Sequence, residues 1–145
     1  MKNPAAAGYS GTPLAAKLGI KTGTVLLAVG APPDYRDLLA PVPDGVAFAS
    51  RLTARIDLIH VFSTSRRKLG AFLSRARRDM RDDAAIWVSW PKKAAVPTDL
   101  TEDVVRELAL PLGLVDIKVC AVDATWSALK LVVRRDQRRA ARTPA

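Results

Sequence analysis

The segment from Trp87 to Lys93, Trp-Val-Ser-Trp-Pro-Lys-Lys, has the residue types in this sequence that are best suited to binding a ligand. Its first four residues are predicted to end a β-strand, and ligands of open parallel sheets bind beyond the carboxyl ends of the strands. Trp90 could stack on a base or another ring, while Lys92 and Lys93 could bind phosphate or carboxylate. Ser89 precedes them on the same strand. In the alternative interpretation, the Trp90 indole covers the end of the sheet and both lysines are solvated.

Three more residues are predicted to lie at the same edge of the sheet. Asp34 follows the first predicted strand, and Asp123 and Trp126 lie in the predicted turn of a C-terminal hairpin. Trp126 could instead be a packing residue, because a large aromatic side chain in a tight turn commonly fills space. The candidate ligand-binding residues are therefore Asp34, Ser89, Trp90, Lys92, Lys93, Asp123 and Trp126.

The single histidine, His60, lies in a strongly apolar segment, which favours a structural, hydrogen-bonded side chain. A general base at this position would need an orienting carboxylate, for which Asp34 and Asp123 are the candidates. Ser63, His60 and Asp34 have the residue types of a nucleophilic triad, but the sequence has no G-x-S-x-G motif. We therefore predict no catalytic residue.

Cofactor and metal signatures are absent from the sequence. One cysteine and one histidine exclude the common metal sites and an intramolecular disulfide. The thiol of Cys120 is expected to be small and buried or at an edge, since a reactive thiolate would need a cation such as Lys118 or Lys130. The loop after the first strand lacks a glycine-rich motif, and Pro32 and Pro33 remove two amide donors, so adenosylmethionine or dinucleotide binding of the usual kind is disfavoured. We predict no cofactor.

The chain is strongly basic, with 23 lysines and arginines against 14 acidic residues, a net charge of +9. Nearly all of the excess lies in residues 66–83 and 134–145. A polyanion such as nucleic acid is one possible partner for these segments; the candidate contacts are Arg67, Arg75, Arg78, Arg138 and Arg139. The alternative is a solvated helix face followed by a basic tail.

Helical and strand patterns alternate along the chain. A short helix is expected after Thr12 and Pro13, with Thr12 as N-cap and Gly19 just beyond its end. A longer helix should follow residues 63–65, and another should begin at a capping pair of Asp99 and Glu102 and run to about residue 109. Strands are predicted over residues 24–29, 46–49, 56–62, 85–90, 115–122 and 129–133, with a short helix or turn over 34–39 and a hairpin turn over 123–127.

This order of elements predicts an α/β fold. We expect a small Rossmann-like, mostly parallel sheet with helices on both faces and a C-terminal antiparallel strand pair, which resembles an abbreviated class I methyltransferase fold. With 145 residues of which 49% are hydrophobic, one domain over residues 9–134 is expected, between a tail of residues 1–8 and a basic tail of residues 135–145. The longest uncharged stretch, residues 3–16, is shorter than a membrane span, so no membrane partner is expected. Residues 1–12 have no apolar signal segment, so we expect a cytoplasmic protein.

Several segments together resemble a bacterial family, mainly actinobacterial, known as domain of unknown function 3052. They are Gly8-Tyr-Ser-Gly-Thr-Pro-Leu14, Ile86-Trp-Val-Ser-Trp-Pro-Lys-Lys93, Thr98-Asp-Leu-Thr-Glu-Asp103, residues 113–123 (Gly-Leu-Val-Asp-Ile-Lys-Val-Cys-Ala-Val-Asp), and Trp126-Ser127. The resemblance spans roughly residues 8–134 and implies a bacterial, cytoplasmic, single-domain protein. It assigns no catalytic or binding residue.

Three functions remain open on the sequence alone. The first is a small binding module that holds a small anion, a nucleotide or a protein partner at the strand carboxyl ends. The second is a divergent methyltransferase-like enzyme, which the order of elements suggests. The third is nucleic-acid binding through the basic helix and tail.

Overall fold

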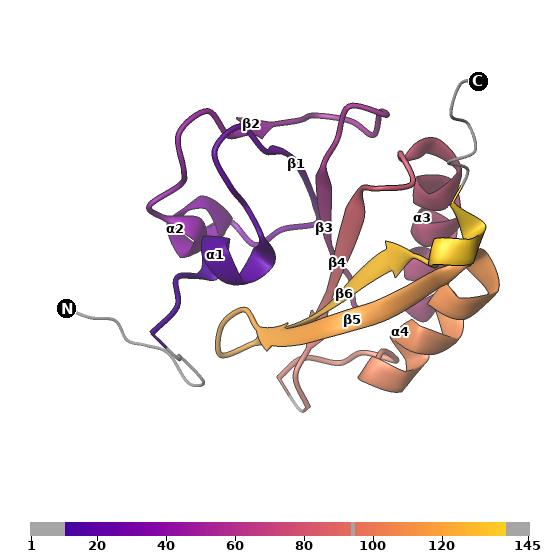
Figure 1. Ribbon diagram of the computed structural model, residues 1–145. Helices are drawn as coiled ribbons and strands as arrows, with labels where there is room; N and C mark the ends of the chain where they lie inside the picture. Colours follow the sequence, from indigo (N-terminus) through magenta and orange to yellow (C-terminus); the bar gives the residue numbers. More distant parts are fainter. Residues whose placement is uncertain (1–10, 94, 139–145) are drawn as a thin grey trace, which may run out of the picture.

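One six-stranded sheet forms the centre of the protein (Figure 1). The computed structural model describes residues 11–93 and 95–138. The strands are β1 (Val25–Val29), β2 (Ala47–Phe48), β3 (Leu58–Phe62), β4 (Ala85–Pro91), β5 (Leu114–Ala121) and β6 (Trp126–Val133), and their spatial order is β2-β1-β3-β4-β6-β5. The first four are parallel, and β6 runs antiparallel to both β4 and β5. The expected mostly parallel sheet with a reversed C-terminal pair is confirmed.

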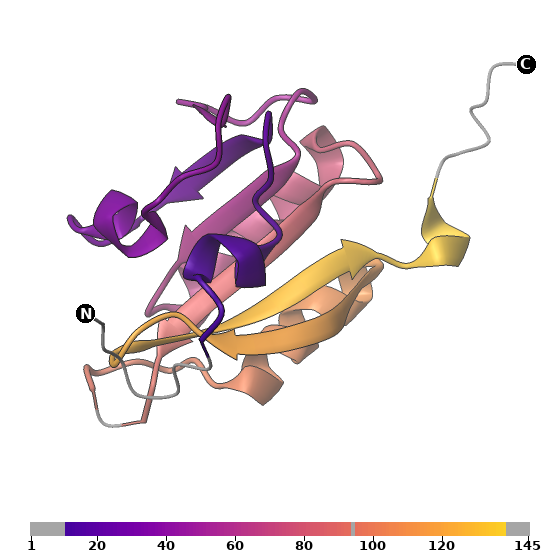
Figure 2. The same cartoon turned by 60° about the vertical axis from the view of Figure 1, so that its left-hand side comes forward.

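Helices cover both faces of this sheet. They are α1 (Leu14–Leu18), α2 (Tyr35–Leu39), α3 (Arg66–Asp79) and α4 (Glu102–Ala109), with 3-10 turns at η1 (Leu110–Leu112) and η2 (Arg135–Gln137). Figures 1 and 2 show α1 and α2 on one side of the sheet and α3 and α4 on the other. Each side has its own apolar core. We call them the α1/α2 face and the α3/α4 face.

Strand β3 suits a central position in the sheet because it has apolar side chains on both faces. All five of its residues are buried. Ile59 and Val61 pack into the core of the α3/α4 face, and Leu58 and Phe62 pack into that of the α1/α2 face. A strand covered on both sides reads as a continuous apolar run, as the sequence predicts here.

Helix α3 follows the predicted pattern closely. Ser65 is its N-cap, and its hydroxyl accepts a hydrogen bond from the Lys68 amide at 3.1 Å. Leu69, Phe72, Leu73 and Ala76 are buried against the sheet. The opposite face is basic and exposed, which is typical of a helix with one side in water.

Two predicted helix starts are wrong by one or two residues. Pro13, not Thr12, occupies the N-cap of α1, and no side chain caps that helix. Gly19 lies just beyond its end as predicted, and it adopts the left-handed conformation. Thr101, not Asp99, caps α4 by accepting from the Val104 amide. The Asp99 carboxylate instead accepts from the Arg66 amide at 2.7 Å, so it stabilises the start of α3.

The C-terminal hairpin is longer than predicted. Trp126 and Ser127, expected in the turn, begin β6 and pair with Pro91 and Trp90 of β4. The chain beyond β6 also remains in contact with the fold: Arg77 donates to the Gln137 carbonyl at 3.3 Å. Residues 135–138 of the predicted basic tail therefore pack on the domain, whereas the predicted tail of residues 1–8 lies outside the described residues. Within the described part of the chain, no helix is both long and apolar enough to cross a membrane.

Gly30 directly follows β1, and its backbone lies close to the end of β3. Its φ is +69°, and a Cβ built there would lie 2.7 Å from the Phe62 carbonyl oxygen. Gly23 has a similar φ of +81° with no atom within 4 Å of its Cβ position. We predict that Gly23→Ala costs about 1–2 kcal/mol of unfolding free energy, the cost of left-handed backbone, and that Gly30→Ala costs about 1–3 kcal/mol more because of the overlap. Urea denaturation of both variants measures the difference, and equal losses would contradict the close approach.

Candidate functional site

The predicted site residues divide between the two faces of the sheet. Trp90 belongs to the core of the α3/α4 face, and Trp126 packs against that of the α1/α2 face. Lys92 and Lys93 follow β4 and share a pocket with Trp90. Asp34 is exposed just before α2. The structure therefore brings Trp90, Lys92 and Lys93 together and leaves the other candidates elsewhere.

A pocket beside Trp90 lies at the carboxyl edge of the sheet and has a volume of about 720 Å³. We call it the β4 pocket. The end of β4, the loop of residues 96–98, the start of α4 and Ser127 of β6 line it. Trp90 is 7% exposed and supplies an apolar wall together with Val96 and Leu100. Pro91 and Pro97 add further apolar surface.

Two lysines give this pocket its charge. Neither Lys92 nor Lys93 forms a salt bridge with any described residue. The carboxylate lining the pocket, Glu102, is already paired with Arg106. The Lys92 amide donates to the Thr125 carbonyl at 2.7 Å, which holds the backbone after β4 against the hairpin. The pocket therefore combines an apolar wall with two ammonium groups available for an anion.

Ser89 does not reach this pocket, contrary to expectation. It is fully buried on the α1/α2 face, where its hydroxyl lies 2.8 Å from His60 Nε2. His60 Nδ1 lies 2.8 Å from the Tyr35 hydroxyl. A continuous hydrogen-bonded chain thus runs from α2 through β3 to β4. Tyr35 was not singled out in the sequence, where the only available signal is its place at the start of a helix that must cover β3.

This buried chain is structural and uncharged. Burial lowers the pKa of His60 to about 3, so the imidazole is neutral near pH 7. Burial also raises the pKa of the Tyr35 hydroxyl well above its usual value, so that group stays protonated. The two ring nitrogens of His60 are bonded to Tyr35 and Ser89 and not to a described carboxylate, and the Ser63 hydroxyl bonds to residue 65. The triad of Ser63, His60 and Asp34 does not form, and the structural interpretation of His60 holds.

Aromatic rings fill the α1/α2 face at the carboxyl ends of β1 and β3. Phe62 stacks on His60 with ring centroids 4.2 Å apart. Tyr35 and Trp126 each meet Phe62 edge-on, at 5.5 Å and 5.1 Å. Trp126 is therefore a packing residue in this structure. Asp123 has a turn-forming role, because its Oδ1 accepts from the amides of residues 125 and 126 at 2.8 Å each.

Cys120 does not have the environment of a reactive thiolate. Burial raises the pKa of its thiol, and the opposing effects of Lys17 and Lys118 are smaller. Among residues 11–93 and 95–138, no group of three His, Cys, Asp or Glu side chains could hold a metal ion.

The arginines proposed as nucleic-acid contacts are partly engaged. Arg67, Arg75 and Arg78 are exposed on α3, but the Arg75 guanidinium lies over the Phe72 ring at 5.4 Å and Arg78 pairs with Asp79. Arg138 donates to the Val133 carbonyl at 3.1 Å. Arg139 lies outside the described residues.

Comparison with known proteins identifies the fold. No family model matches the chain, and no curated protein is similar to it in sequence. Among solved structures, magnesium protoporphyrin IX methyltransferase from Synechocystis with bound SAM is 14% identical, with a TM-score of 0.53 over 83% of this chain and 74% of that one. A tRNA methyltransferase from B. subtilis is 11% identical, with a TM-score of 0.54 over 89% of this chain and 67% of that one. A putative type 11 methyltransferase from Sulfolobus solfataricus is 14% identical, with a TM-score of 0.54 over 77% of this chain and 85% of that one.

At these sequence identities, the structural similarity establishes the fold but not the function. The chain has the α/β fold of class I methyltransferases in a short form, as the order of elements predicts.

The buried histidine predicts a specific pH dependence of stability. The pKa of His60 is about 3 in the folded protein and about 6.5 when unfolded, so the unfolded chain binds more protons between these values. The unfolding free energy should therefore fall as the pH drops from 6.5 toward 3. Between pH 7 and pH 4 we expect the wild type to lose roughly 3 kcal/mol more than His60→Gln, which lacks this titration. Urea denaturation at both pH values measures the loss, and parallel losses in the two proteins would exclude a neutral His60.

Proposed function

We propose that the chain is a ligand-binding domain on the class I methyltransferase fold, and that the β4 pocket binds a small anionic ligand with a flat or apolar part. The observation that carries the proposal is the pairing of an apolar wall at Trp90 with Lys92 and Lys93, which form no salt bridge with a described residue. A nucleotide fits this chemistry, because a base can pack on apolar surface while its phosphate meets the lysines.

A second candidate is an S-adenosylmethionine-dependent methyltransferase, which the likeness to methyltransferase structures favours. The residues after β1 do not fit that cofactor well. Gly30 is the only glycine of the loop, Pro32 and Pro33 lack amide hydrogens, and the Phe62 carbonyl lies against Gly30. The rings of Tyr35, His60 and Phe62 fill the space behind this loop. We therefore rank this function second.

A thermal-shift panel with a matched pair of variants tests the proposal. The ligands are adenosine monophosphate, S-adenosylmethionine, S-adenosylhomocysteine and a short RNA, at fixed ionic strength. The double substitution Lys92→Gln with Lys93→Gln removes the pocket charges. Its control, Arg67→Gln with Lys68→Gln, removes two charges from the exposed face of α3.

We predict that adenosine monophosphate stabilises the wild type and the control more than it stabilises the pocket variant. A ligand at about 100 times its Kd adds about 2.7 kcal/mol of stability, which moves the melting temperature by several degrees. A shift with S-adenosylmethionine that survives in the pocket variant would favour the second candidate. An RNA shift that is lost in the α3 control and in high salt would favour nucleic-acid binding. No shift with any anion would contradict the proposal.

A further inference from the structure

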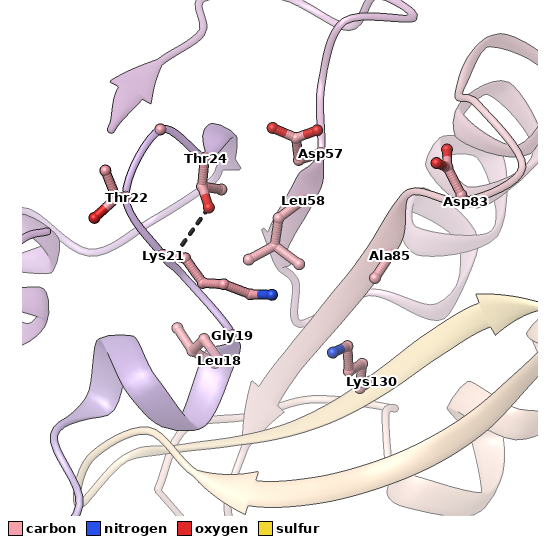
Figure 3. A pocket seen from close by; sticks show the side chains of 11 residues that line it. Leu18, Gly19, Lys21, Thr22, Thr24, Asp57, Leu58, Asp83, Ala85 and Lys130 are labelled. Atoms are coloured by element: carbon pink, nitrogen blue, oxygen red, sulfur yellow. Dashed lines mark hydrogen bonds between the residues drawn. The ribbon is translucent and has the colours of Figure 1, made fainter. Parts of the chain in front are cut away.

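A second pocket lies at the opposite edge of the sheet, where the parallel strands begin (Figure 3). Its volume is about 370 Å³. The loop between α1 and β1 forms one wall, the residues just before β3 and β4 form another, and Lys130 of β6 closes the side. We call it the amino-edge pocket. It shares no lining residue with the β4 pocket.

Lys130 is held in this pocket by apolar surroundings. It pairs with Trp87 across the β4–β6 ladder, and its Nζ lies 5.9 Å from the centre of the Trp87 ring. The Nζ also lies 3.6 Å from the Cβ position of Gly19, which ends α1. The side chain is half-buried, and it forms no salt bridge with a described residue. Burial, together with Lys118 and Lys21 nearby, lowers its pKa.

Lys21 faces Lys130 across the pocket (Figure 3). It too forms no salt bridge with any residue in the described ranges. Its backbone amide donates to Thr24 Oγ1 at 2.9 Å, which fixes the loop. Because Thr24 Oγ1 is the acceptor in that bond, the hydroxyl hydrogen can be donated to a ligand. The pocket thus presents two ammonium groups and one hydroxyl.

The two carboxylates at the rim form no salt bridge with these lysines. Arg81 binds both of them, with its Nη2 2.9 Å from Asp57 and its Nε 2.8 Å from Asp83. Asp57 also accepts from the Val25 amide at 2.8 Å, and this bond and Arg81 lower its pKa, so it stays ionised. The pocket keeps two like charges close together, one of them partly desolvated. A compact doubly charged anion between them would offset both the repulsion between the two ammonium groups and the desolvation of Lys130.

We propose that the amino-edge pocket binds the phosphate group of a small ligand between Lys21 and Lys130. Phosphate carries nearly two negative charges and accepts several hydrogen bonds, which matches two ammonium groups and the Thr24 hydroxyl. The small volume and the carboxylates at the rim disfavour a long polyanion, whose further phosphates would approach Asp57 and Asp83. This site is independent of the proposed function of the β4 pocket.

Phosphate titrations of matched variants test the site. Inorganic phosphate and pyrophosphate are titrated by calorimetry at fixed ionic strength, with chloride as the balancing anion. All proteins carry Lys92→Gln and Lys93→Gln, so that the β4 pocket contributes nothing. Lys21→Gln and Lys130→Gln remove one ammonium each, Lys130→Arg keeps the charge, and Lys68→Gln on exposed α3 is the control.

We expect Lys21→Gln and Lys130→Gln to weaken phosphate binding at least about tenfold, while Lys68→Gln leaves it unchanged and Lys130→Arg retains most of it. Carbon NMR of labelled lysines adds a second readout, in which phosphate raises the pKa of Lys130 toward its ordinary value. Phosphate binding that is equal in all variants, or absent from the parent protein, would overturn the proposal. So would a Lys130 signal that responds equally to chloride. Loss of ligand binding at the β4 pocket alone would leave these results unchanged, so the two proposals fail separately.

Discussion

The chain of hydrogen bonds from Tyr35 through His60 to Ser89 constrains much of this fold. His60 lies on β3, where every residue is buried, so both ring nitrogens need partners inside the protein. A buried polar group left without a partner costs about 1–3 kcal/mol. One partner comes from α2 and the other from β4, 25 and 29 residues away in the sequence. Helix α2, only five residues long, must therefore lie over β3 at one fixed place.

The position of α2 in turn determines which part of the carboxyl edge is open. Tyr35 brings a ring against Phe62, and Trp126 meets Phe62 from the hairpin. The space beyond β1 and β3 on that face is consequently apolar and filled. On the other face, Trp90 lies near the end of β4 beside the start of α4, and two lysines follow Pro91. This chain thus has the sheet of the methyltransferase fold, and a carboxyl-edge cavity lies beside β4.

Local patterns made most of the fold predictable. Apolar runs located β1, β3 and β4, and the apolar spacing after the candidate caps of residues 63–65 located α3. Two of the errors concern polar side chains that had more than one possible partner. Asp99 was expected to cap its own helix, but it binds the Arg66 amide 33 residues away, which no local pattern reveals. Ser89 was wrongly assigned to the ligand-binding site for a related reason. The sequence does not show that His60, on the neighbouring strand, is its hydrogen-bond partner. The lysines of the amino-edge pocket come from distant segments, so only the folded chain brings them together.

The two cation types have different roles in this basic protein. Every salt bridge among the described residues is made by an arginine, and none by a lysine. A guanidinium with several fixed donors can join two or three carboxylates, as Arg81 and Arg106 do here. An ammonium is a compact charge on a flexible stem, suited to meeting a phosphate inside a pocket. The net charge of +9 already subtracts the carboxylates of these salt bridges, so the excess positive charge belongs to basic residues outside them. Much of the arginine charge in the folded part stabilises the fold, and the lysines of the two pockets supply charge that small anions can use.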